Sequence, residues 1–179
     1  MTATRAYTRR LSRLLDARPI TRVERRAAER WYVDAQRHAD QLAHVLDVDR
    51  VTGACILSAY SIRTSWADNV RDAWHYATAD TPPPGLRART VIADAALVHG
   101  LDALRGPKTH AFARACSGDR SAVVVDVWMC RAAGLHRDTP TTVQYRRITA
   151  AIESLARRHG MSPRGMQALL WGRVRGSLD

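Results

Sequence analysis

The sequence predicts an all-α fold, a compact multi-helix domain of eight to ten helices. Apolar residues make up 46% of the 179 residues, which is enough to bury a core. They recur at helical spacing in most segments of the chain. A run of β-branched residues, Val123–Val125, is only three residues long and isolated. We therefore interpret it as a buried extended entry to a helix rather than a strand.

Composition limits the classes of function. The net charge of +11 indicates a polyanionic partner, most often nucleic acid, although an arginine-rich GC-rich genome is an alternative explanation. Cys55, Cys116 and Cys130 lack the spacing of a metal knuckle or a disulfide framework. No apolar run approaches the roughly 18 residues of a membrane span, and no apolar stretch follows the basic N-terminus. We expect a cytoplasmic monomer without cofactor, metal or membrane contact.

The first third of the chain predicts a basic segment and two helices. Residues 1–20 are expected to form a basic arm or helix, ahead of a single all-α domain over residues 21–179. Thr21 followed by Glu24 is the pattern of a capping box, so a long amphipathic helix is expected over Thr21–Leu46. The small residues of Val51–Ser61 suit a close-packed central helix.

The middle third predicts helices on either side of a proline-rich loop at residues 80–85. One helix is expected over Ser61–Ala79, with Ser65 as a plausible cap and Asn69 on its apolar face. A buried amide needs hydrogen-bond partners, so Asn69 either ties two helices together or contacts a ligand. The next helix, Arg87–His99, is expected to end at Gly100 and to point four apolar residues inward: Val91, Ile92, Ala95 and Val98.

The last third predicts a series of helices separated by glycine and proline. The expected segments are a short helix or turn at Leu101–Leu104, then helices over Lys108–Cys116, Val127–Ala133 and Thr142–His159, and a final helix that starts at Ser162-Pro163 and runs to about Val174.

A glycine turn and a lysine form the first candidate site. Gly106-Pro107 opens the helix that carries Lys108, and a helix N-terminus is suited to binding phosphate. A lysine on a short apolar helix is expected to be partly desolvated, which lowers its pKa and makes the amine available for a Schiff base. The alternative is a surface lysine that contacts a phosphate.

A carboxylate forms the second candidate site, 18 residues after the lysine. Asp126 ends the apolar run, where a carboxylate can stabilise a sugar cation or position a water molecule. The alternative is an N-cap of the helix Val127–Ala133, and the two roles are compatible. We expect the fold to bring Lys108 and Asp126 together.

These residues resemble the helix-hairpin-helix DNA glycosylase superfamily, and in particular its endonuclease III-like group. The resemblance covers about residues 51–134 and includes Leu104-Arg105-Gly106-Pro107-Lys108-Thr109, Val125-Asp126-Val127-Trp128-Met129-Cys130-Arg131 and Ile56-Leu57-Ser58-Ala59-Tyr60. The lysine-to-aspartate separation equals that of the bifunctional members. The chain departs from the family at Leu104 (in place of the first hairpin glycine), at Pro107, at Val127-Trp128 and in lacking the four-cysteine iron–sulfur cluster.

The resemblance implies a role for each candidate residue. Lys108 would be the Schiff-base nucleophile and Asp126 the catalytic carboxylate. The residues expected near the DNA backbone are Arg105, Gly106, Thr109, Arg114, Arg120 and Arg131. The base-pocket candidates are Tyr60, Trp66, Asn69, Trp128, Gln167 and Trp171. Gln167 and Trp171 are four residues apart and share a helix face, where they either read a base or pack against other helices.

Three hypotheses for function remain at this point. The first is a glycosylase that flips a modified or damaged base out of duplex DNA and excises it, with lyase activity at abasic sites. The second is a base-modifying enzyme that acts on modified pyrimidines, as in phage DNA. The third is a non-catalytic helix-hairpin-helix DNA-binding protein. The presence of both Lys108 and Asp126 favours an enzyme over a binding protein.

Overall fold

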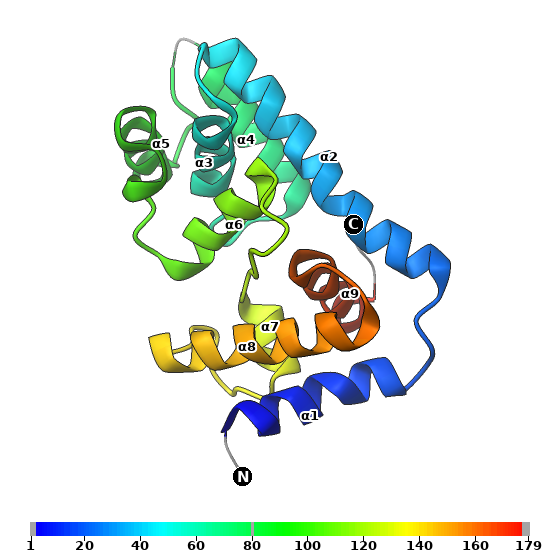
Figure 1. The fold of residues 1–179 in the computed structure, drawn as a ribbon. Coiled ribbons are helices and arrows are strands. Elements are labelled where there is room, and N and C mark those ends of the chain that lie inside the picture. The colour runs from blue at the N-terminus through cyan, green and yellow to red at the C-terminus, as the bar shows by residue number, and fades with distance from the viewer. Residues whose placement is uncertain (1–2, 80, 177–179) are drawn as a thin grey trace. The chain divides into compact units, whose positions relative to one another are not determined.

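The computed structural model describes residues 3–79 and 81–176, and this part of the chain is all-helical, without a strand (Figure 1). The predicted fold class is therefore confirmed at the level of an all-α, multi-helix protein. The elements are α1 (Ala3–Asp16), α2 (Arg22–Leu46), α3 (Arg50–Tyr60), α4 (Trp66–Thr78), α5 (Arg87–His99), the 3-10 helix η1 (Gly100–Ala103), α6 (Pro107–Ser117), α7 (Val127–Ala132), α8 (Thr142–His159) and α9 (Pro163–Arg175).

The chain forms two compact units. Unit 1 contains Met1–Tyr32 and Arg120–Asp179, and unit 2 contains Val33–Asp119. The long helix α2 contributes its first part to unit 1 and its second part to unit 2.

In unit 1, α8 packs against both α1 and α9, and α7 packs against α9 (Figure 1). Leu11 and Leu15 of α1 are buried together with Ile148, Ile152 and Leu155 of α8. The basic N-terminal segment is thus a helix whose apolar face is covered by its own unit.

An arginine of α9 fixes the corner between α1 and α2. The side chain of Arg173 is only 5% exposed. It donates hydrogen bonds to the carbonyl oxygens of Leu14, Arg18 and Pro19, at 2.7, 3.0 and 3.2 Å. It also pairs with the Glu24 carboxylate at 3.2 Å. Arg173 therefore contacts the end of α1, the turn after it and the start of α2.

The Glu24 carboxylate is held in its ionised form by this arrangement. Burial acts to raise the pKa of Glu24, but hydrogen bonds from the Thr21 backbone and from Arg173 outweigh it and lower the pKa to about 2. Thr21 and Glu24 exchange hydrogen bonds at 3.0 and 3.1 Å, so the predicted capping box is confirmed.

In unit 2, α3 is the central helix and packs against α4, α5 and α6 (Figure 1). All of its residues from Thr52 to Tyr60 are buried. The close approach of α2 depends on Gly53, since a Cβ there would lie 2.3 Å from the Ala39 carbonyl oxygen and 2.9 Å from the Ala43 nitrogen. The prediction of a close-packed central helix is confirmed.

Two predictions in unit 2 are wrong in detail. Residues 61–65 form a loop rather than the first turn of α4, because Ser65 caps the helix by accepting from the Asp68 amide. On α5, Val91 and Val98 do not point inward, since they are 58% and 75% exposed. The buried residues of α5 are Ala93 and Ala96, whose small side chains allow α5 to pack closely against α3.

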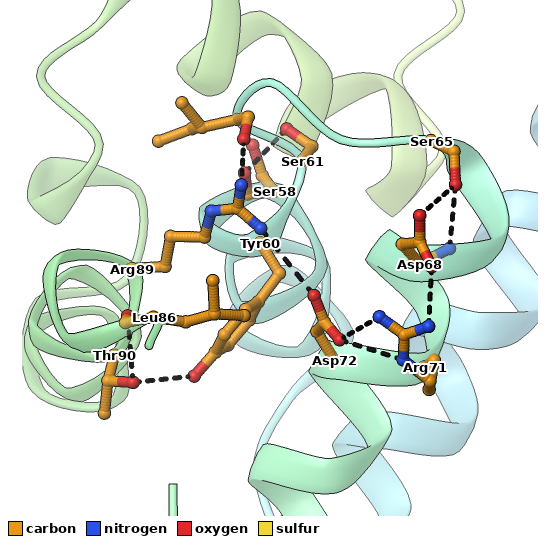
Figure 2. A network of polar contacts seen from close by, with 11 residues as sticks. Ser58, Tyr60, Ser61, Ser65, Asp68, Arg71, Asp72, Leu86, Arg89 and Thr90 are labelled. Atoms are coloured by element: carbon orange, nitrogen blue, oxygen red, sulfur yellow. Dashed lines mark hydrogen bonds and ion pairs between the residues drawn. The ribbon is translucent and has the colours of Figure 1, made fainter. Parts of the chain in front are cut away.

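The α3–α4 loop is held by a network of polar contacts (Figure 2). Arg89 of α5 donates to the Ile62 carbonyl oxygen and pairs with Asp72 of α4 at 3.7 Å. Asp72 also accepts two hydrogen bonds from Arg71, which reaches Asp68 as well. These contacts hold the loop next to α4 and α5.

Candidate functional site

Lys108 is the only lysine in the chain, and it lies half-buried in the first turn of α6. Its Nζ donates to the carbonyl oxygen and the hydroxyl oxygen of Ser61, at 2.9 and 2.8 Å. Ser61 is the C-cap of α3. The amine therefore sits between the carbonyl end of the central helix α3 and the N-terminal turn of α6.

Aromatic side chains adjoin this lysine. Nζ lies 5.3 Å from the centre of the Phe112 ring. The Trp66 ring meets Phe112 edge-on at a centroid distance of 6.4 Å, and it meets the His38 ring at 5.8 Å. The lysine and one base-pocket candidate, Trp66, thus belong to one cluster of side chains in unit 2.

In unit 2, His38 is half-buried and Asn69 is buried. Burial lowers the pKa of His38, which favours the neutral imidazole. Asn69 is 1% exposed, and neither its Oδ1 nor its Nδ2 has a hydrogen-bond partner among the described residues. The expected tie between two helices is not formed. A buried amide without partners is costly, so Asn69 has polar atoms to offer a ligand or a water molecule.

The residues that lead into α6 are only partly arranged as a phosphate site. Gly106 is the N-cap and supplies no capping side chain, and Pro107 at the first helical position has no N–H. The hydroxyl of Thr109 donates to the Gly106 carbonyl oxygen at 3.0 Å. Arg105 is exposed. Its side chain is therefore the candidate best placed for phosphate at this turn.

Tyr60, another base-pocket candidate, is fully buried. Its hydroxyl pairs with that of Thr90 at 3.1 Å, which joins α3 to α5 (Figure 2). Burial raises the pKa of Tyr60. In unit 2 this side chain packs the interface between two helices.

Asp126 caps α7 in unit 1, as its alternative role predicts. Its Oδ1 accepts from the Met129 amide at 2.9 Å, and its Oδ2 accepts from the Trp171 indole N–H at 2.8 Å. Trp171 is also flanked by Trp31, at a centroid distance of 6.0 Å, and by the Arg175 guanidinium at 4.4 Å. Asp126 and Trp171 were both candidate residues, and the fold brings them together.

The extended segment before Asp126 is held by a tyrosine. The Tyr145 hydroxyl donates to the Val123 carbonyl oxygen at 3.0 Å and accepts from the Val125 amide at 3.2 Å. Burial, and to a smaller extent the charge of Asp126, raise the pKa of Tyr145 to about 12. These bonds fix the backbone that places the carboxylate. The buried, non-strand run Val123–Val125 is confirmed.

The remaining base-pocket candidates in unit 1 have packing partners. Gln167 is buried and accepts from the Tyr32 hydroxyl at 2.6 Å. Trp128 is half-buried, with the Arg131 guanidinium 5.1 Å from its ring.

Three of the four candidate DNA-binding arginines form ion pairs. Arg114 pairs with Asp119, Arg120 with Glu29 at 3.6 Å, and Arg131 with Asp138 at 3.4 Å. A phosphate would have to compete with these carboxylates, which reduces what each arginine can contribute to binding.

Lys108 and Asp126 lie in different units. Their expected meeting therefore stays a prediction. Ser61, the partner of Lys108, was missed because it is 47 residues away in the chain and no local pattern links the two. In the described parts of both units, no group of three or more histidine, cysteine or acidic side chains is placed to hold a metal ion.

The fold and these side chains define an all-helical protein with a half-buried lysine in one unit and a helix-capping aspartate in the other. The chain belongs to a family of unknown function, DUF7178, whose model matches residues 1–178. No curated protein and no solved structure matches the chain. Among the described helices, none is long and apolar enough to cross a membrane.

Proposed function

We propose that the protein is a DNA glycosylase-like enzyme of the helix-hairpin-helix type that excises a modified or damaged base from duplex DNA and uses Lys108 as a Schiff-base nucleophile. The proposal rests mainly on Lys108. A chain that uses arginine for its other 27 cationic side chains has one lysine, half-buried beside Phe112 and Ser61. Arginine cannot form a Schiff base at neutral pH because its guanidinium stays protonated.

The chemistry requires the neutral amine. After the target nucleotide leaves the base stack, Nζ attacks C1′ and the N-glycosidic bond breaks, so that the base departs with the bonding electrons and is protonated. The C1′–O4′ bond then breaks, a proton moves from the amine to O4′, and the opened sugar carries a protonated imine at C1′. Loss of a C2′ proton then breaks the C3′–O bond and releases the phosphate.

Asp126 has the complementary role in this proposal. A carboxylate near C1′ stabilises the positive charge that develops on the sugar as the base leaves. The indole N–H of Trp171 and the amide of Met129 hold that carboxylate in one orientation. Without a lysine nucleophile, the same carboxylate can position a water molecule for hydrolysis.

The test is borohydride trapping on duplex DNA with an abasic site. We expect a covalent adduct with the wild-type protein, no adduct with Lys108→Ala, and an undiminished adduct with Arg87→Ala, which removes an exposed cation of the same unit that is not among the candidate residues. An adduct that persists in Lys108→Ala would assign the imine to another amine and contradict the proposal.

A non-catalytic DNA-binding protein is the second candidate. The observation that favours it is that Lys108 and Asp126 both have structural partners, at Ser61 and at Met129 and Trp171. DNA binding with neither an adduct nor base release would support this candidate. A change in a modified pyrimidine without strand scission would instead support a base-modifying enzyme.

A further inference from the structure

The net positive charge of the protein comes from one of its two units. Unit 1 has 19 arginines against 7 acidic residues, a net charge of +12. Unit 2 has 9 cationic residues against 10 acidic ones, a net charge of −1. A genome-wide preference for arginine would enrich both units, so it does not explain this division. The unit that contains the glycine turn and Lys108 is not the cationic one.

Two helices of unit 1 carry exposed arginines at every fourth position. On α1 these are Arg5, Arg9 and Arg13, and on the first part of α2 they are Arg22, Arg26 and Arg30. Residues four apart lie on the same face of a helix, about 6 Å apart along its axis. We call these six residues the arginine stripes.

The two stripes are joined at the corner that Arg173 and Glu24 hold. Arg173 bonds the last carbonyl oxygens of α1 and the turn that follows it, and Glu24 lies in the first turn of α2. A held corner lowers the entropic cost of placing both stripes on one partner.

The acidic residues beside the stripes pair with other arginines. Glu24 pairs with Arg18 and Arg173, and Glu29 pairs with Arg120. In addition, α1 has Asp16 as its only acidic residue, at its last position. The ion pairs of these two glutamates are thus formed with arginines outside the stripes.

We propose that the arginine stripes of α1 and α2 are a docking surface for the phosphate backbone of duplex DNA, separate from the glycine turn before α6. Arginine donates in a planar fork that matches phosphate, and clustered arginine on a helix is the footprint of backbone binding. Contacts of this kind carry no base specificity, and they hold the duplex while other residues read it.

An anionic membrane surface would be the other polyanion to consider, and the packing of α1 argues against it. An amphipathic helix binds a membrane by inserting its apolar face below the headgroups. The apolar face of α1, with Leu11 and Leu15, is buried within unit 1 next to α8. Only the cationic face remains for a partner.

This inference needs the partner of the proposed function, DNA, but not its chemistry. The test is therefore equilibrium binding of the full-length protein to a fluorescein-labelled 20-base-pair duplex without any lesion, followed by anisotropy between 50 and 200 mM KCl. The stripe variants are Arg5→Gln/Arg9→Gln/Arg13→Gln and Arg22→Gln/Arg26→Gln/Arg30→Gln. The control variant, Arg37→Gln/Arg63→Gln/Arg87→Gln, removes the same charge from exposed positions of unit 2.

Each stripe variant is expected to bind at least about tenfold more weakly than wild type at 100 mM KCl. The slope of log K against log [KCl] should become less steep by about 2.7, the value for three lost phosphate contacts. The control variant should bind within about twofold of wild type. Glutamine has a helix propensity close to that of arginine, and circular dichroism with a melting curve confirms that each variant is folded.

The other outcomes distinguish a failure of this inference from a failure of the proposed chemistry. Stripe variants that bind like wild type, or a control variant that weakens equally, would remove the stripes from the binding surface, even if Lys108 still forms its adduct. Cosedimentation with phosphatidylserine vesicles but no binding to the duplex would replace DNA by a membrane. Loss of binding in the stripe variants without any wild-type adduct would uphold the stripes and reject the proposed chemistry.

Discussion

Single side chains at the proposed site also hold local structure. Asp126 caps the first turn of α7 and accepts a hydrogen bond from the indole N–H of Trp171. Lys108 donates a hydrogen bond to Ser61, the C-cap of α3. For Asp126, the role of helix N-cap is compatible with that of catalytic carboxylate. For Asp126 the structural alternative, the N-cap, is confirmed, while the catalytic role is a proposal.

At the scale of one residue, a substitution of Asn69 is expected to change stability and activity in opposite directions. Replacement by leucine removes a buried amide without partners, so Asn69→Leu should raise the free energy of unfolding by about 1–3 kcal/mol. If the amide contacts the flipped base, base release should fall at least about tenfold in the same variant. Denaturant melts and a base-release assay measure the two effects.

The matched control for this prediction is Gln144→Leu, which removes an amide with a partner. Gln144 accepts from the Thr141 amide in the capping box of α8 at 2.8 Å. Its replacement should destabilise the protein by about 1 kcal/mol and leave base release unchanged. A loss of stability in Asn69→Leu comparable to that of the control would mean that Asn69 is a satisfied structural residue.

At the scale of elements, hydrophobic spacing predicted the bounds of the helices better than the face that each helix buries. The bounds of Arg87–His99 and Thr142–His159 are confirmed as predicted. Yet α5 buries Ala93 and Ala96 and exposes Val91 and Val98. A helical period fits several faces of the same sequence, and the neighbouring helix selects among them. The tight contact with α3 selects the face with the smaller side chains.

Gly53 tests this dependence on close packing. In an exposed helix, alanine in place of glycine stabilises by about 1 kcal/mol. Here the added Cβ would meet backbone atoms of Ala39 and Ala43, so Gly53→Ala should instead destabilise by about 1–3 kcal/mol. Gly106→Ala is the control, because its Cβ meets only the flexible Thr109 hydroxyl, at 3.1 Å. Equal melting temperatures for the two variants would contradict the close contact.

At the scale of the whole molecule, the two compact units differ in net charge. The net charge of the sequence suggests a polyanionic partner, but the division into two units shows that the charge belongs to unit 1. The arginines near the glycine turn were predicted as DNA contacts because they adjoin it in sequence. Three of them form ion pairs with carboxylates, and the regularly spaced arginines lie far earlier in the chain.

The labelling rates of the three cysteines measure whether each unit stays folded. Cys55 and Cys116 are buried in unit 2 and Cys130 in unit 1, all as free thiols. Burial raises the pKa of Cys55 to about 12 and that of Cys130 to about 11, so both stay protonated at pH 8. Ellman's reagent should label them far more slowly than an introduced exposed thiol, Ala88→Cys. All three should react at once in denaturant.

The contrary result for this prediction is labelling of the native thiols at the rate of the Ala88→Cys thiol at pH 8. Mass spectrometry of the labelled peptides would then show which unit opens. Labelling confined to Cys130 would assign the opening to unit 1, and labelling of Cys55 and Cys116 would assign it to unit 2.

The sequence by itself determined the helical class, most helix bounds, the caps at Thr21, Ser65 and Ser162, and the candidate pair Lys108 and Asp126. These are local properties, set by the spacing of apolar residues and by hydrogen bonds within a turn. Only the tertiary structure decided that Lys108 bonds Ser61, that Asp126 accepts from Trp171, that Asn69 is buried without a partner, and that the charge lies in unit 1. Those features join residues 45 or more positions apart, or depend on which face of a helix is covered, and no local pattern encodes them.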